Sequence, residues 1–196
     1  ADDCIAQPGW IAERLAAHKS GASSVSSALL SHRADNPVAL AAHLSLYVCR
    51  LPKTHPDSAL KYGASYNRAL FERHGLFRED MEGGEDTEFH DRLRDADRPI
   101  WRPEVRTVHT GVETIGDLLK TQYQRGQRMA AVSYLLGRHS RGAIAKDAVR
   151  RTSRIIRESL SFTERSERLT VLLAIPFIAI GNLAYAWGAW TSKAPK

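Results

Sequence analysis

The chain has 196 residues, of which 43% are hydrophobic and 26% charged, so it suits one domain of ordinary size with a packed core. The net charge of +6 is unevenly placed, because nine Lys or Arg residues and four acids between Arg138 and Arg168 give a surplus of five there. The rest of the chain is close to neutral, which argues against a globally basic nucleic-acid binder.

The chain begins at Ala1 without an initiator methionine, and no signal-peptide pattern opens it. We therefore expect either a processed chain or part of a longer protein. Cys4 and Cys49 are widely separated and match no metal-binding spacing, which suggests reduced thiols in a cytoplasmic compartment.

In residues 8–51, sequence patterns typical of helices alternate with stretches of small residues. A Pro-Gly turn precedes apolar residues at helical spacing, which predict a short helix over 11–19. Residues 22–31 are serine-rich and fit a short strand or a loop. Asn36-Pro37 is a typical helix start, and the apolar positions that follow predict a helix reaching Leu51.

The middle of the chain predicts short strands between helices. We expect a strand over 62–66, helices over 67–75, 87–95 and 115–136, and two strands, 99–101 and 105–109, separated by Pro103.

Three acids crowd behind a diglycine in the stretch Gly83-Gly84-Glu85-Asp86-Thr87-Glu88, and His109 follows at the end of a predicted strand. Such a loop is a reasonable place for a general base, and such a histidine is a reasonable metal ligand. The acids explain a helix start equally well, because negative charge is favourable in a first helical turn.

The segment 169–192 contains no charged residue and is long enough to span about 30 Å of hydrocarbon as a helix. Tyr185, Trp187 and Trp190 gather near its end, as in an interfacial aromatic belt. Pro176 and several glycines also allow a re-entrant or tilted helix, and the remaining alternative is a buried core helix. The basic stretch 138–168 then fits a cytoplasmic juxtamembrane helix attracted to anionic lipid.

Read in order, these pieces resemble the second half of a family-2 glycosyltransferase of the GT-A fold. The resemblance covers roughly residues 1–135 and rests on the small-residue strand and helix of 63–77, Gly84-Glu85-Asp86-Thr87-Glu88-Phe89, Arg92-Leu93, and the stretch from Pro103 to His109. It implies a partial GT-A fold of class α/β, with short mixed-sheet strands and flanking helices, and then the basic helix and the apolar membrane helix.

The resemblance also implies roles for individual residues. Asp86 matches the catalytic base of an inverting transfer, and Glu85 would tune or orient it. His109 matches a ligand of Mg²⁺ or Mn²⁺, and Asp3 or Asp2 would supply the last carboxylate of an Asp-x-Asp motif. The substrate-binding positions implied are Gly63, Ser65, Arg68, Gly84, Gln122 and Arg125.

Two departures from the family pattern bear on function. Gly126 stands where processive members carry Trp after the Gln-x-x-Arg element. The nucleotide-binding half of the family would lie upstream of Ala1, so we expect residues 1–137 to be the acceptor-side half of a domain that transfers no sugar alone.

The expected function is inverting transfer from a nucleotide-diphosphate sugar to a cell-envelope or lipid-linked glycan. The expected location is the cytoplasmic face of a membrane, the inner membrane of a bacterium, with no nucleic acid as partner. The alternative is a non-catalytic membrane-interaction module built on 138–168 and 169–192.

Overall fold

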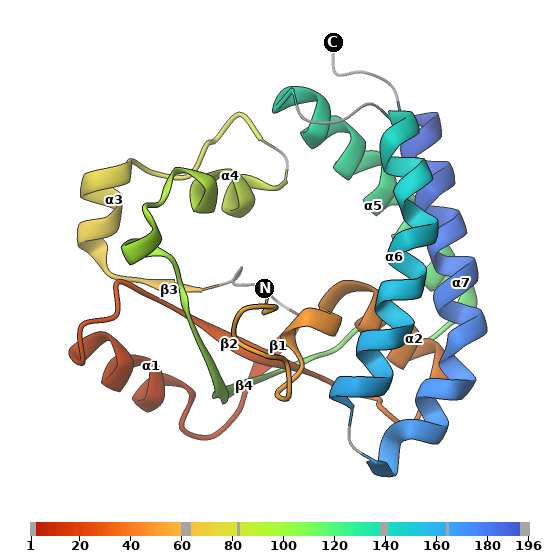
Figure 1. Ribbon diagram of the computed structural model, residues 1–196, viewed down its shortest axis with the longest axis horizontal. Helices are drawn as coiled ribbons and strands as arrows, with labels where there is room; N and C mark the ends of the chain where they lie inside the picture. The colour runs from red at the N-terminus through yellow and green to blue at the C-terminus, as the bar shows by residue number, and fades with distance from the viewer. Residues whose placement is uncertain (1–2, 60–63, 82, 138–140, 164, 193–196) are drawn as a thin grey trace. The chain divides into compact units, whose positions relative to one another are not determined.

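The computed structural model describes residues 3–59, 64–81, 83–137, 141–163 and 165–192, and it divides the chain into two compact units. The first unit comprises residues 1–30 and 49–109, and the second comprises 31–48 and 110–196. Figure 1 labels the helices and strands of both. The fold is mixed α/β, with one curled four-stranded mixed sheet and an apolar C-terminal helix.

The sheet has the strand order β1-β4-β2-β3, formed by β1 (Cys4–Ala6), β2 (Ser24–Ser31), β3 (Ser65–Tyr66) and β4 (Ile100–His109). β1 pairs antiparallel with β4, and β3 pairs antiparallel with β2. The segment 22–31, predicted as a strand or a loop, contains the strand β2 from Ser24 to Ser31. Residues 62–63 of the predicted strand 62–66 lie outside the described residues, and the strand itself is Ser65–Tyr66.

The prediction that Pro103 separates two strands is wrong, because β4 runs without interruption from Ile100 to His109. The pairing of β1 with β4 covers only Thr107 to His109. Pro103 therefore lies beyond that paired end, where proline removes no hydrogen bond between β1 and β4.

The helices of the first unit are α1 (Trp10–Lys19), α3 (Arg68–His74) and α4 (Glu85–Arg92), with a 3-10 turn η2 (Asp95–Asp97) before β4. Gly75 follows α3 with φ of 78°, as the sequence predicted for a helix-ending glycine. The predicted helix 87–95 begins two residues earlier and ends three residues earlier than expected. Gly84, with φ of 79°, lets the chain turn directly into Glu85.

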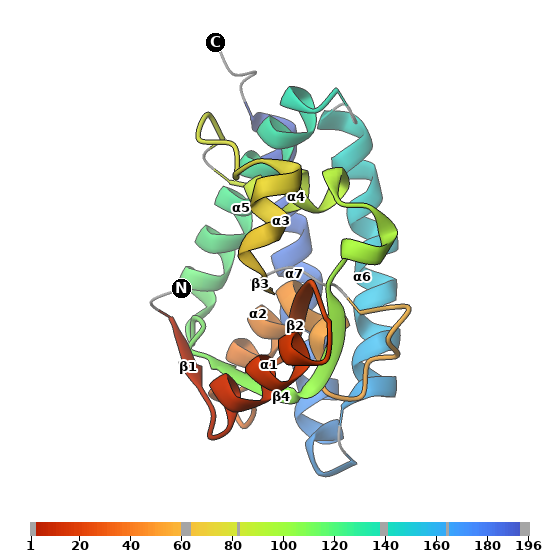
Figure 2. The same cartoon turned by 90° about the vertical axis from the view of Figure 1, so that its left-hand side faces the viewer.

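The second unit consists of α2 (Pro37–Tyr47), α5 (Ile115–Leu135), α6 (Arg141–Phe162) and α7 (Arg168–Thr191). Two 3-10 turns, η1 (Val48–Arg50) and η3 (Arg165–Glu167), follow α2 and precede α7, so the predicted helix reaching Leu51 ends as an α-helix at Tyr47. Helix α7 packs against α2, α5 and α6. Figure 2 shows α7 between α5 and α6.

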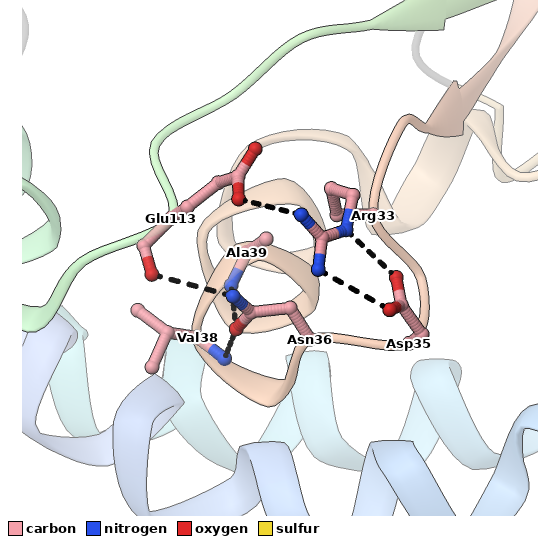
Figure 3. Close-up of polar contacts among 6 residues, drawn as sticks. All are labelled: Arg33, Asp35, Asn36, Val38, Ala39 and Glu113. Atoms are coloured by element: carbon pink, nitrogen blue, oxygen red, sulfur yellow. Dashed lines mark hydrogen bonds and ion pairs between the residues drawn. The ribbon is translucent and has the colours of Figure 1, made fainter.

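Asn36 explains why α2 begins where it does. Its side-chain oxygen accepts hydrogen bonds from the backbone amides of Val38 (2.9 Å) and Ala39 (3.2 Å), which satisfies two otherwise unpaired donors of the first turn. Figure 3 shows that the start of α2 is also connected to the segment before α5. Arg33, which precedes α2, forms ion pairs with Asp35 and with Glu113 of that segment.

Glycines let α5 and α7 approach each other closely. A Cβ atom added to Gly126 would lie 2.0 Å from the carbonyl oxygen of Tyr185, and one added to Gly188 would lie 2.0 Å from that of Tyr123. Neither position has room for a side chain. This packing gives a physical reason for glycine, rather than tryptophan, after Arg125.

Candidate functional site

Asp3 and His109 meet at the end of the β1–β4 pair. The register places Cys4 opposite His109, and the Nε2 atom of His109 lies 3.1 Å from Oδ2 of Asp3, although 106 residues separate the two in sequence. The side chain of His109 is buried at 7% exposure, whereas that of Asp3 is 47% exposed. An imidazole nitrogen and a carboxylate oxygen therefore stand together with one side open to solvent.

Cys4 lies beside this pair and is hydrogen-bonded to Asp3. Its Sγ donates a hydrogen bond of 3.4 Å to Asp3 Oδ1. Burial raises the pKa of the Cys4 thiol, and the neighbouring Asp3 adds to the effect. The pair thus offers one carboxylate oxygen and one imidazole nitrogen, with the Cys4 thiol hydrogen-bonded beside them. Among the described residues, no three His, Cys, Asp or Glu side chains form a group suited to a metal ion.

The three acids behind the diglycine occupy the first turn of α4. Asp86 accepts hydrogen bonds at Oδ1 from the Thr87 amide (2.7 Å) and the Thr87 hydroxyl (3.3 Å). Glu88 forms an ion pair of 2.9 Å with Arg92 one turn later. The acids are thus a helix start, as the alternative interpretation predicted, and Glu88 supports the helix.

An aromatic cluster fixes α4 in place. Phe89 is fully buried, and its ring centroid lies 4.9 Å from that of Phe77, 5.2 Å from that of Phe71 and 5.4 Å from that of Tyr66. These rings come from α3, β3 and the loop between α3 and α4. Such pairs add about 0.5–1.5 kcal/mol each beyond the area they bury, so the first turn of α4 has a defined position.

Tyr66 and His90 form a polar pair near Asp86. The Tyr66 hydroxyl lies 2.7 Å from His90 Nε2. Burial, and then the charge of Asp86, raise the pKa of Tyr66 to about 12. Burial lowers the pKa of His90, while Asp86 acts in the opposite direction. The carboxylate of Asp86 is therefore close to both groups, which keeps the phenol protonated.

His90 was not recognised from the sequence. It lies four residues after Asp86, and this spacing places both on one side of a helix once α4 is known to include them. The sequence predicted a helix beginning at Thr87. Asp86 was therefore outside the predicted helix, and its helical spacing to His90 could not be recognised.

Two buried arginines meet at Ser27 in β2. Arg14 donates to the Val25 carbonyl and to the Ser27 hydroxyl, both at 2.8 Å, and Arg50 donates to the Ser27 carbonyl at 2.8 Å. Burial lowers the pKa of Arg14 to about 10, with a smaller contribution from Arg50. No sequence signal marked either residue, because an arginine on a short amphipathic helix is ordinarily exposed.

The other predicted residues of the first unit are dispersed. The Ser65 hydroxyl lies 2.9 Å from Nε2 of His18, and Arg68 is exposed beside Glu72. Gly84 precedes α4, and Glu85 is its first residue. The predicted positions Asp2 and Gly63 lie outside the described residues.

Gln122 and Arg125 belong to the second unit. Gln122 is buried on α5, and a Cβ added to Gly181 of α7 would lie 3.5 Å from its Cγ. Arg125 donates to the Ser45 carbonyl at 3.0 Å and stands over the ring of Tyr185 at 5.9 Å. Burial, followed by the charge of Arg151, lowers the pKa of Arg125 to about 9.

Arg151 shares these partners, since it donates to the Ser45 carbonyl at 2.7 Å and lies 4.5 Å from the centre of the Tyr185 ring. It also lines a groove of about 920 Å³, whose walls carry four cations and one carboxylate: Lys146, Arg150, Arg151 and Arg154, with Asp147. Within the second unit, Arg125 therefore contributes to packing between helices beside a cationic groove.

No family model, no curated protein and no solved structure matches the chain.

Proposed function

We propose that this chain is the acceptor-side half of an inverting glycosyltransferase that works at a membrane. The donor would be a nucleotide-diphosphate sugar, and the acceptor a cell-envelope or lipid-linked glycan. The nucleotide's base and ribose would be bound by a half that the family resemblance places before residue 1.

The observation that carries the proposal is the contact between Asp3 and His109. These two residues were selected from separate motifs, and the β1–β4 register brings their side chains to 3.1 Å. One carboxylate oxygen and one imidazole nitrogen suit Mn²⁺ better than Mg²⁺, which prefers oxygen ligands alone. Asp3 and His109 would hold such an ion together with diphosphate oxygens. When bound, the ion supplies charge stabilisation for the departing diphosphate.

Asp86 is the proposed general base. Because Oδ1 accepts from the Thr87 amide and hydroxyl, Oδ2 is the oxygen that would take the proton of the acceptor hydroxyl. The aromatic cluster around Phe89 holds the first turn of α4 and so orients this carboxylate. Glu85 would orient the acceptor or tune Asp86.

Membrane attachment has support in the helical unit. Among the residues that the structure describes, one segment, Arg165–Thr191, is a helix long and apolar enough to cross a membrane. The preceding basic stretch would contact anionic lipid on the cytoplasmic face. An enzyme held there could reach a lipid-linked acceptor.

Transfer assays test the catalytic assignment. We expect this chain alone to transfer no sugar, and detectable turnover would contradict the proposed division into halves. In a longer polypeptide that includes the nucleotide-binding half, Asp86→Asn should lower kcat by about 10²–10⁴-fold, the usual contribution of a general base. Asp80→Asn is the matched control, because Asp80 is exposed and pairs with Arg78.

Binding of Mn²⁺ tests the metal assignment without turnover. In titrations followed by electron paramagnetic resonance with a nucleoside diphosphate present, His109→Ala and Asp3→Asn should each weaken binding by about tenfold or more. His55→Ala is the control, since His55 is exposed beside Asp57. Equal affinity in all variants would refute the assignment.

The competing candidate is a non-catalytic membrane-interaction module, favoured by the large apolar side chains exposed on α7. It predicts that Asp86→Asn leaves the function of the longer protein unchanged, whereas deletion of 138–192 abolishes that function. Binding to anionic vesicles but not to RNA would support either membrane candidate over a nucleic-acid binder.

A further inference from the structure

The two sides of α7 differ in the size of their residues. The side that packs within the second unit is buried and rich in small residues, with a spacing of three and four: Val171, Ala174, Ile178, Gly181, Tyr185 and Gly188. At Gly188 this side touches the backbone of α5. This face is therefore already occupied by protein.

The opposite side of α7 is a continuous apolar stripe. Its large side chains are between 37% and 68% exposed and fall on one side of the helix: Leu169, Leu172, Leu173, Ile180, Leu183, Trp187 and Trp190. We call this set the α7 stripe. The stripe follows most of α7, a helix of 24 residues that is about 36 Å long, and a contiguous exposed apolar surface marks an interaction site.

Charged helices run beside α7. Helix α6 packs against it, and Figure 1 shows the two side by side. Helix α6 carries exposed cations every three or four residues, at Lys146, Arg150, Arg154 and Arg157, and the first three of them line the groove described above. Helix α5, also packed on α7, exposes Lys120 and Arg128. If α7 crossed a bilayer with this packing intact, these cations would enter the hydrocarbon, at a cost of several kcal/mol for each.

We propose that α7 lies in the plane of an anionic lipid surface, with the α7 stripe inserted among the acyl chains and α5 and α6 on the aqueous side. This inference rests on the membrane attachment in the proposed function and specifies its geometry. The helix does not cross the bilayer, so its two ends stay at one depth.

The composition of α7 and the positive charge of the preceding segment indicate that the α7 stripe contacts a lipid surface. Segment 169–192 contains no charged residue, two tryptophans stand at one end of the stripe, and exposed Arg165 and Arg168 stand at the other. Residues 138–168 carry a surplus of five positive charges, which favours anionic headgroups. The same charge would repel a second copy of the chain.

Vesicle binding is the first test. The whole chain should bind vesicles that contain phosphatidylglycerol more tightly than vesicles of phosphatidylcholine alone, and salt should weaken the difference. Leu172→Gln, Leu183→Gln and Trp187→Gln should each weaken binding by about tenfold. Ile11→Gln and Leu76→Gln are controls, because these side chains are 66% and 71% exposed but lie in the first unit.

Depth measurement separates lying in the plane from crossing. Single nitroxide labels at positions 172, 180 and 187, in a background with Cys4 and Cys49 replaced by serine and alanine, report immersion depth by electron paramagnetic resonance. In-plane binding predicts equal, shallow depths. A crossing helix predicts that position 180 lies about 10 Å deeper than the other two, from a rise of 1.5 Å per residue.

A depth profile with its maximum at position 180 would overturn the in-plane geometry while leaving the proposed catalytic function intact. Binding that is equal for anionic and neutral vesicles, or concentration-dependent dimers that shield the labels without lipid, would also overturn it. Loss of the Asp86→Asn effect in transfer assays would instead refute the catalytic proposal and leave the lipid geometry standing.

Discussion

Replacing Gly126 by alanine tests the close approach of α5 and α7. The added methyl would lie 2.0 Å from the Tyr185 carbonyl oxygen and 2.8 Å from the Ala189 backbone nitrogen. Backbone atoms cannot rotate away as a flexible side chain can, so the two helices must separate. Overpacking of this kind costs about 1–3 kcal/mol, and the obstacle here favours the upper end.

The gain in helix propensity opposes this cost. Alanine is favoured over glycine inside a helix by about 1 kcal/mol. The net loss expected for Gly126→Ala is therefore about 2 kcal/mol. In a chain of this size that corresponds to a fall in Tm of about 4–8 °C.

Gly116→Ala is the matched control, because Gly116 lies on the same helix and an added Cβ would have no atom within 4 Å. We expect its Tm to be unchanged or raised by up to about 4 °C. The assay is thermal unfolding followed by far-UV circular dichroism in the presence of lipid. A Tm for Gly126→Ala equal to that of the wild type would refute the close packing and the explanation for glycine after Arg125.

Three further predictions concern local interactions. Asn36→Ala removes the cap of α2 and should lower the free energy of unfolding by about 1 kcal/mol in denaturant titrations, while Asn36→Ser should recover most of the loss. Hydrogen bonding from His74 holds the pKa of Asp97 below its ordinary value, so the stability it contributes is present above about pH 4 and is lost as pH falls through the folded-state pKa. Asp97→Asn should flatten that part of the acid unfolding curve, and an unchanged slope would contradict the assignment. Because Asp86 opposes the lowered pKa of His90, Asp86→Asn should lower that pKa further in nuclear magnetic resonance titrations, and an unmoved value would place the carboxylate elsewhere.

Local signals in the sequence were sufficient for most helix boundaries. Asn36-Pro37 at the start of α2 and Gly75 at the end of α3 act through their own backbone and side chain, so their effect is visible in a few consecutive letters. Thr114 similarly caps α5 by accepting from the Asp117 amide. The mixed α/β class followed from such signals, and the structure confirms it at that level.

Features that depend on residues far apart in the sequence were harder to predict. Pro103 lies in an unbroken strand and outside the part of β4 that pairs with β1, and the strand register that decides this cannot be read from residues 99–109 alone. Arg14 and Arg50 are buried because both guanidinium groups reach β2 across the fold. The meeting of Asp3 with His109 was expected from family resemblance alone, since no spacing rule links residues 106 positions apart.

Helix α7 illustrates why a uniformly apolar segment needs a structure for its interpretation. A hydropathy window averages over the helix circumference, so it treats Gly181 and Leu183 as parts of one apolar run. In the structure Gly181 faces α5, whereas Leu183 is 67% exposed. One side of α7 therefore packs against protein, and the opposite side is free to contact lipid. Length and composition alone fit a crossing helix, whereas a helix with charged neighbours along its packed side has only one face left for lipid. The depth of position 180 relative to positions 172 and 187 is therefore the measurement that decides how this chain meets a membrane.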